Sequence, residues 1–181
     1  FNENHFHSFG RVALNLQDLL KTQVNIDIDS VWKKVNLLNL LSQYPVNMLA
    51  NFMANFHVSG SLQAPKYTGS MYLSANWVDI IPLSISMRDL RLQARFNNFN
   101  QLHLDGAVTL KDKQLTVKGN LQFPDEAHSI LSGHVLMQGD NLSVFDFSNN
   151  YLNFSPHINL KITWPNINIS GLINIDKAFL K

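Results

Sequence analysis

The sequence contains no cysteine, and only 15% of its 181 residues are charged. Without cysteine the chain has no disulfide framework, no thiolate metal site and no cysteine nucleophile. Soluble domains usually carry about 25% charged residues, so neutral polar side chains, asparagine above all, must cover much of this surface. The formal net charge is only +1. Nonspecific nucleic-acid binding needs many basic residues, so we expect no nucleic-acid partner and no polybasic membrane anchor.

Long apolar runs are also missing. No stretch approaches the ~18 apolar residues that a membrane-spanning helix needs, and the chain does not open with a basic and then apolar signal peptide. The length of 181 residues suits one domain with a real core. Because the chain begins at Phe1 rather than at methionine, we expect it to be a piece of a longer protein.

The sequence lacks the motifs that carry catalysis. It has no Gly-x-Ser-x-Gly elbow, no phosphate-binding glycine loop and no His-Glu-x-x-His pattern. Its acidic residues fall at predicted turns or at polar strand positions, so we expect no enzyme, no catalytic residue and no cofactor. Glu3, His5 and His7 could share one strand face, but no third strong ligand accompanies the histidines, and we predict no metal site.

Alternation of apolar and polar residues dominates what is present, and Leu102–Phe123 shows it best. Two alternating arms flank the turn residues Lys111, Asp112 and Lys113. Successive side chains of a strand point to opposite faces, so this stretch predicts a hairpin with one apolar face. The same period runs from Val46 to the end of the chain, with a change of phase at Arg88–Asp89.

The first 45 residues are less regular. Two short alternating runs predict two strands, and a helix is predicted at about residues 30–43, ended by Tyr44–Pro45. Such a helix would pack on the sheet, with a lid or a partner-docking helix as the alternative. The residues behind these predictions are Val12, Leu14 and Leu16 for the first strand, Val24, Ile26 and Ile28 for the second, and Val31, Val35, Leu38 and Leu41 for the apolar stripe of the helix.

One glycine-containing pattern, apolar-x-apolar-x-Gly-x-apolar, recurs along the chain. A glycine inside a strand lets the sheet bend or lets another group approach the backbone. Two interpretations stay open: a coiled sheet over a closed core, or a sheet folded into an open trough. The glycines concerned are Gly60, Gly106, Gly119 and Gly171, with Gly133 in a shortened version.

Four phrases of the sequence, in a fixed order, resemble a known family. They are SGSLQAPKYTGSM at Ser59–Met71, the proline-containing break and strand at Ile81–Leu92, the paired glycine-containing strands at Leu102–Phe123, and a closing phrase at Ser155–Leu160 and Ile169–Leu180. Together they resemble the TamB family of translocation and assembly module subunits, which is AsmA-like. The match runs from Val46 to Lys181. It departs at Asp176, where the family usually has proline, and at the turn Lys111–Lys113, where the family has glycines.

The resemblance implies an all-β fold with one short helix: an elongated curved sheet folded into a U-shaped trough, a β-taco with an apolar inner face. It divides the chain into N-terminal strands with the helix at 1–45 and the TamB-like segment at 46–181, joined as one unit. It implies a periplasmic location, in a protein anchored in the inner membrane of a Gram-negative bacterium.

The implied function is a bridge that gives phospholipids an apolar groove toward the outer membrane and supports assembly of outer-membrane proteins and autotransporters with the TamA barrel. Implied partners are phospholipid acyl chains, neighbouring segments of the same protein, TamA and unfolded outer-membrane proteins. The alternative is a chaperone-like module that binds unfolded strands by β-augmentation. Residues predicted to line the groove are Val58, Leu62, Leu104, Val108, Val117, Leu121, Val135, Ile169 and Ile173, and the glycines named above are predicted to curve the sheet.

Overall fold

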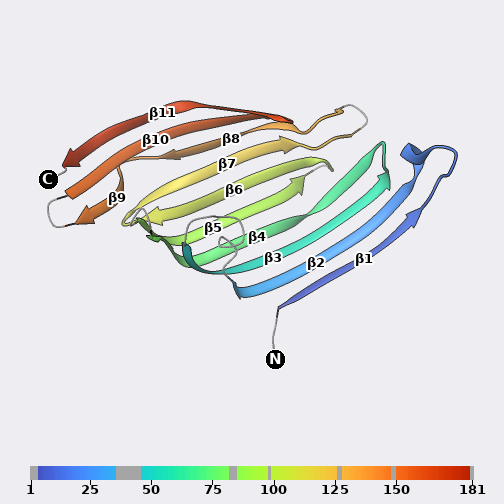
Figure 1. Cartoon of the computed structure of the whole chain (residues 1–181), viewed down its shortest axis with the longest axis horizontal. Coiled ribbons are helices and arrows are strands. Elements are labelled where there is room, and N and C mark those ends of the chain that lie inside the picture. The colour runs from blue at the N-terminus through green and yellow to red at the C-terminus, as the bar shows by residue number, and fades with distance from the viewer. Residues whose placement is uncertain are drawn as a thin grey trace.

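The chain forms one open antiparallel sheet in a computed structural model (Figure 1). The structure describes residues 4–35, 46–81, 85–97, 99–125, 128–147 and 150–179. Within these ranges eleven strands follow one another in space nearly as in sequence, in the order β1-β2-β3-β4-β5-β6-β7-β8-β10-β11, with β9 also paired to β10. The strands are β1 (His5–Ala13), β2 (Gln23–Val35), β3 (Val46–Ser61), β4 (Pro65–Ile80), β5 (Ile85–Asn97), β6 (Gln101–Leu110), β7 (Lys113–Gln122), β8 (Ser132–Gly139), β9 (Leu142–Phe147), β10 (Asn150–Thr163) and β11 (Asn166–Phe179).

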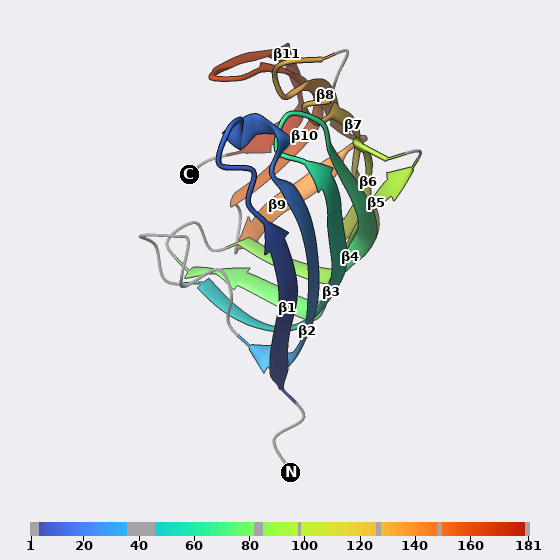
Figure 2. The same ribbon diagram turned by 90° about the vertical axis from the view of Figure 1, so that its right-hand side faces the viewer.

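The sheet is strongly curved and does not close into a barrel. Strands β1 and β11 form its two edges, and along the path between them each strand pairs only with its neighbours. Figure 2 shows the strands bending along their length, so that the sheet wraps around one of its faces. The predicted all-β fold with a curved open sheet is confirmed.

The first strand lies earlier than predicted. β1 ends at Ala13, so Val12 belongs to it, but Leu14 and Leu16 lie in the connection that follows. The Asn15 side chain explains the early end: its Oδ1 accepts hydrogen bonds from the backbone N–H groups of Gln17 and Asp18, both at 3.1 Å. Such an asparagine turn competes with the strand ladder. A single turn of 3-10 helix, η1 (Leu19–Lys21), then leads into β2.

The helix predicted at about residues 30–43 is wrong over its first six residues, because Ser30–Val35 continue strand β2. Ser30 pairs with Ala54 and Val31 with Met53, and a bulge then lets Val35 pair with Ala50. The four-residue spacing of Val31 and Val35 matches a helical stripe, but the bulge leaves Val31 opposite Met53 on one face and Val35 opposite Ala50 on the other. Residues 36–43 lie outside the described ranges.

Bulges keep the apolar residues of neighbouring strands on the same face of the sheet. The sequence changes phase between Ala75 and Val78 in β4 and between Met87 and Leu90 in β5. The two changes lie opposite each other, since Ala75 pairs with Leu90 and Val78 with Met87. Asp89 adopts a left-handed φ of 52° there, as bulged residues often do. The phase change predicted at Arg88–Asp89 is thereby confirmed.

Two residues that interrupt the ladder lie at irregular positions of β10 and β11. Pro156 lies in β10 opposite the break between β8 and β9, where its missing N–H costs no ladder hydrogen bond. Asp176 is the extra residue of a bulge in β11, because Phe154 pairs with Ile175 and Asn153 with Lys177. A bulge is also a position that tolerates proline. Aspartate and proline are therefore both compatible with the strand pairing at position 176.

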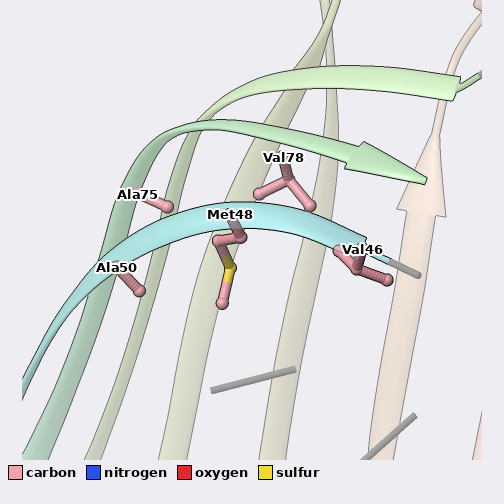
Figure 3. Close-up of a cluster of buried hydrophobic side chains, with 5 residues drawn as sticks. All are labelled: Val46, Met48, Ala50, Ala75 and Val78. Carbon is pink, nitrogen blue, oxygen red and sulfur yellow. The ribbon is translucent and has the colours of Figure 1, made fainter. Parts of the chain in front are cut away.

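A small core closes one end of the sheet, where β3 begins and β4 ends. Val46, Met48, Ala50, Ala75 and Val78 are all buried there, and Figure 3 shows them gathered on the two strands. Leu142 of β9 is also fully buried, and β9 lies near β5, β6 and β7. Burial of each large side chain contributes about 1.5–3 kcal/mol. Contacts among these buried side chains therefore stabilise this end of the sheet.

At the opposite end, the connections between strands are tied together by Asn100. Its Nδ2 donates to the carbonyl oxygens of Pro65 (2.8 Å) and Pro124 (2.9 Å), and its Oδ1 accepts from the Tyr67 N–H. The side chain is almost completely buried, and its φ of 58° is left-handed, a conformation that asparagine tolerates. One residue thus links the β3–β4, β5–β6 and β7–β8 connections.

Replacing Asn100 with alanine should therefore lower the free energy of unfolding by about 1–3 kcal/mol, because buried partners lose their hydrogen bonds. Urea unfolding followed by circular dichroism would measure this. Asn100→Gly keeps the left-handed backbone but loses the side chain, so the difference between the two variants isolates backbone strain. Asn120→Ala, on an exposed strand position, should change stability by less than about 0.5 kcal/mol. Equal effects at positions 100 and 120 would contradict the role of Asn100.

Candidate functional site

The pairing register creates one apolar face that extends across the whole sheet. Residues directly opposite each other in neighbouring strands lie on the same face, so a row of such pairs can be followed from one edge to the other. One row contains a single polar member, Ser30, whose Oγ accepts a hydrogen bond from the indole N–H of Trp32 at 2.5 Å. From β1 to β11 this row is Phe6, Ser30, Ala54, Met71, Ala94, Leu104, Gly119, Val135, Leu160 and Ile169.

The opposite face is polar in the same register. Moving one residue along each strand replaces the apolar row with a row in which every side chain is polar or charged. From β1 to β11 this second row is His7, Asp29, Asn55, Ser70, Arg95, His103, Asn120, His134, Lys161 and Asn168. We call the first face the inner face and the second the outer face.

The inner face is covered in the middle of the sheet and exposed at both edges. In the central strands Ala94 is 1% exposed and Val135 is buried, whereas Ile169 in the edge strand β11 is 72% exposed. Phe6 in the other edge strand is exposed as well. The sheet folds over its own apolar face in the middle and leaves the same face exposed in the edge strands β1 and β11.

Four aromatic rings gather on the inner face near the end tied by Asn100. The rings of Tyr67 and Phe96 are stacked with centroids 5.8 Å apart, and the Phe123 ring lies 5.4 Å from Tyr67 and 5.1 Å from Phe96. Phe56 meets Phe96 edge-on at 6.1 Å. All four side chains are only half-buried. They make this end of the inner face aromatic and partly accessible, in contrast to the buried core at the other end.

Two histidine–aspartate pairs lie on the outer face. His57 Nδ1 lies 2.7 Å from Asp27 Oδ1, and His5 Nε2 lies 3.2 Å from Asp29 Oδ2. Within the described ranges, no group of three or more histidine, cysteine, aspartate or glutamate side chains could hold a metal ion. In the same part of the chain, no helix is long and apolar enough to cross a membrane. The inner face is thus a continuous apolar surface, and the ion pairs named here lie on the outer face.

Comparison with known proteins gives one informative match. No family model matches the chain, and no solved structure matches it significantly. Among curated proteins, the translocation and assembly module subunit TamB of Haemophilus influenzae is 23% identical over 178 residues, which are 97% of this chain. The chain is a TamB-like segment. It covers 14% of that relative's length, and the match includes the N-terminal residues that the sequence phrases left unassigned.

The structure brings the predicted groove residues of the TamB-like segment to one face. Eight of the nine lie in strands on the inner face, and Leu62 lies just beyond β3 in the following connection. Their exposure varies with position. Val108 and Val135 are buried, Val58, Leu104, Val117 and Leu121 are half-buried, and Leu62, Ile169 and Ile173 are exposed. That they line a lipid groove stays a prediction.

The five predicted glycines fall into two groups. At Gly133 and Gly171 an added Cβ would collide with a backbone carbonyl oxygen of the neighbouring strand, that of Asn120 or of His157. At Gly106 and Gly119 the nearest atoms belong to side chains, Leu92 Cδ1 at 2.7 Å and Val135 Cγ2 at 2.9 Å. Gly60 has a φ of 95°, and an added Cβ would lie 2.7 Å from the Ala64 carbonyl oxygen in the connection between β3 and β4. Close approach of strands therefore explains these glycines, and their part in curvature stays a prediction.

Several inner-face residues were missed by reasoning from the sequence. Gly69 has a φ of 122°, and an added Cβ would meet the Asn55 carbonyl oxygen. The alternating pattern Tyr67-x-Gly69-x-Met71 could have identified this glycine as part of the apolar face. The aromatic cluster could not be found, because its rings come from strands β3, β4 and β5 and from the residue after β7. Burial of Leu142 depends on how β9 meets the central strands, which the local pattern does not encode.

Gly133 offers a direct test of close strand approach. Gly133→Ala should lower the free energy of unfolding by about 1–3 kcal/mol, because a Cβ meets the neighbouring backbone and the left-handed φ of 154° becomes strained. Gly10→Ala is the matched control. Gly10 lies in edge strand β1, where an added Cβ would lie 3.1 Å from Ile26 Cγ1 and 3.4 Å from the Asn25 carbonyl oxygen, so only a small shift is needed and the cost should stay below about 1 kcal/mol. Chemical denaturation measures both, and a Gly133→Ala variant as stable as the parent chain would refute the account.

Proposed function

We propose that this TamB-like segment gives phospholipid acyl chains an apolar trough between the inner and outer membranes. In this role it is one periplasmic segment of a longer bridge anchored in the inner membrane. The bridge supports assembly of outer-membrane proteins and autotransporters together with TamA. The observation that carries the proposal is the unbroken apolar row from Phe6 in β1 to Ile169 in β11.

The dimensions of the row suit an acyl chain. Neighbouring strands lie about 4.8 Å apart, so a row across ten strands extends about 40 Å. One leaflet of a bilayer is about 15 Å of hydrocarbon. An acyl chain lying across the strands would thus contact apolar side chains along its whole length, and each CH₂ kept from water contributes about 0.8 kcal/mol.

The uniform apolar character of the row suits movement of an acyl chain along it. Its members are aliphatic, aromatic or small, and the single hydroxyl at Ser30 is already hydrogen-bonded to Trp32. No deep polar pocket in the row would hold a chain at one position. Similar affinity at every step lets an acyl chain slide along the row without being trapped, as transfer requires.

The exposed edges suit a continuing trough. In β11 the side chains of Ile167, Ile169, Ile173 and Ile175 lie on the inner face and are all exposed. Leaving four isoleucines in water is costly. Neighbouring segments of the same long protein would cover them by pairing with β11, and the same holds for Phe6 at the β1 edge. The trough would then continue beyond this segment.

Two adjacent residues of β11 provide a matched test. Ile173 lies on the inner face and is 56% exposed, whereas Leu172 lies on the outer face and is 61% exposed. Ile173→Arg should weaken binding of a phospholipid with a fluorescent acyl chain about tenfold or more, since about 1.4 kcal/mol of lost contact corresponds to one factor of ten. Leu172→Arg should leave the affinity within about twofold.

Both positions are exposed, so neither arginine should unfold the sheet, and thermal unfolding of the two variants serves as the control. Phospholipid found by mass spectrometry in organic extracts of the detergent-free parent chain would support the proposal. Equal losses of binding at positions 172 and 173, or no loss at either, would remove the inner face from the binding site.

Strand addition is the second candidate. It is favoured by the edge strands β1 and β11, which pair on one side only within the described ranges. β11 presents fourteen residues with every described side chain exposed, and it contains no proline. Such an edge can pair with an extended chain through backbone hydrogen bonds. In that case an unfolded outer-membrane protein would be the partner. Because backbone groups carry the contact, arginine at 172 and at 173 should then affect peptide binding alike.

A further inference from the structure

The short strand β9 leaves the plane of the sheet and lies over the inner face. In the plane it would continue the place of β8 beside β10, about 10 Å from β6 and about 14 Å from β5, because neighbouring strands are about 4.8 Å apart. Instead β9 lies close to β5 and β6 as well as to β7. In Figure 2 it lies within the curve of the sheet, next to β10. One strand of the sheet therefore covers part of the trough from the inside.

Leu142, the first residue of β9, fills a place on the inner face where the sheet has no side chain of its own. A row of inner-face residues, parallel to the apolar row, runs from Val108 in β6 through Leu115 in β7 to Gly139 in β8. A Cβ added at Gly139 would point to this face and lie 2.6 Å from Leu142 Cδ1. The Leu142 side chain, which is 0% exposed, thus occupies the position that a side chain at Gly139 would take.

Burial along β6 follows the position of β9. Val108 and Leu110 are buried, at 7% and 4% exposed. Leu104, on the same strand and the same face, is only half-buried. The inner face is therefore more deeply covered in the row that ends at Gly139 than in the apolar row that contains Leu104.

β9 is attached to the rest of the sheet on one side only. Within the described ranges it pairs with β10 and with no second strand. The pairing comprises five residue pairs, Asn150–Phe154 against Leu142–Phe147, with a register shift between Leu152 and Asn153. The turn before β9 has a left-handed Asn141 with a φ of 48°. Short, singly paired strands open locally at a lower free energy than central strands.

We propose that β9 is an autoinhibitory strap whose Leu142 side chain competes with an acyl chain for the inner face. The competing ligand is the phospholipid acyl chain, so this inference rests on the function proposed above. With the strap closed, Leu142 takes the place of hydrocarbon at Gly139. With the strap open, the row from Val108 to Gly139 is added to the surface that the apolar row offers. The apparent affinity for phospholipid is then set by the fraction of open molecules.

The complete burial of Leu142 separates competition from a lining role. A side chain that lines a groove presents part of its surface to the ligand. Leu142 is 0% exposed, so in the closed strap an acyl chain has no surface of Leu142 to contact. Shortening Leu142 therefore affects phospholipid binding through opening of the strap, and the expected sign is a gain of affinity.

The affinity for a phospholipid with a fluorescent acyl chain tests the competition. Leu142→Ala should tighten binding about fivefold or more, because the open fraction rises. Gly139→Ala should act in the same direction, since its methyl group displaces the Leu142 side chain without removing it. The control Leu160→Ala, in the apolar row itself, should weaken binding. Thermal unfolding of each variant establishes that the sheet is still folded.

Opening of the strap can be measured by cysteine labelling, because the parent chain contains no cysteine. Val108 and Ala54 form a matched pair, each 7% exposed; Val108 lies in the row that ends at Gly139, and Ala54 lies in the apolar row in β3. Leu142→Ala should speed the reaction of a Val108→Cys variant with a maleimide about tenfold or more, since the open fraction rises. The rate of an Ala54→Cys variant should stay within about twofold.

The two measurements separate failure of the strap from failure of the proposed function. Tighter phospholipid binding together with faster labelling at position 108 would support the strap. Weaker binding by both Leu142→Ala and Gly139→Ala would overturn it, because Leu142 would then belong to the binding surface. Equal acceleration at positions 54 and 108, or none at position 108, would also overturn it. Absence of phospholipid binding in the parent chain and in every variant would overturn the proposed function, and the competition with it.

Discussion

The pairing register of the strands is the constraint on which the rest of the structure depends. Because side chains alternate with a period of two, a slip of one residue in any pair would move the apolar set of that strand to the outer face. The paired bulges of β4 and β5 show how the register survives changes of phase: Ala75 and Val78 stay opposite Leu90 and Met87. Without them the inner face would break in the middle of the sheet.

In a single sheet with one apolar face, that face is either buried by other side chains or exposed to solvent and to binding partners. Here the Val46–Met48 end and Leu142 cover part of it, while the two edge strands leave theirs exposed. In the proposed role, neighbouring segments of the longer bridge would cover the exposed apolar side chains of both edge strands.

Most of the sheet could be predicted from the sequence, because alternation is a local property. The hairpin at Leu102–Phe123, the phase change at Arg88–Asp89 and the sharing of one face by the predicted groove residues follow from it. The errors came from local interruptions of the ladder. Asn15 ends β1 before Leu14, and the helix-like spacing of Val31 and Val35 spans a bulge in β2. The aromatic cluster and the Asn100 links depend on neighbouring strands, which no local pattern contains.

Photocrosslinking tests the central claim most directly, namely that the inner face receives acyl chains. A phospholipid with a photoreactive group at the end of its acyl chain would be bound to the protein and irradiated. Mass spectrometry would then identify the modified residues. Adducts should fall on the inner face in several strands, with Leu104, Leu160 and Ile169 modified and their outer-face neighbours His103, Lys161 and Asn168 unmodified. Adducts spread equally over both faces would contradict the account.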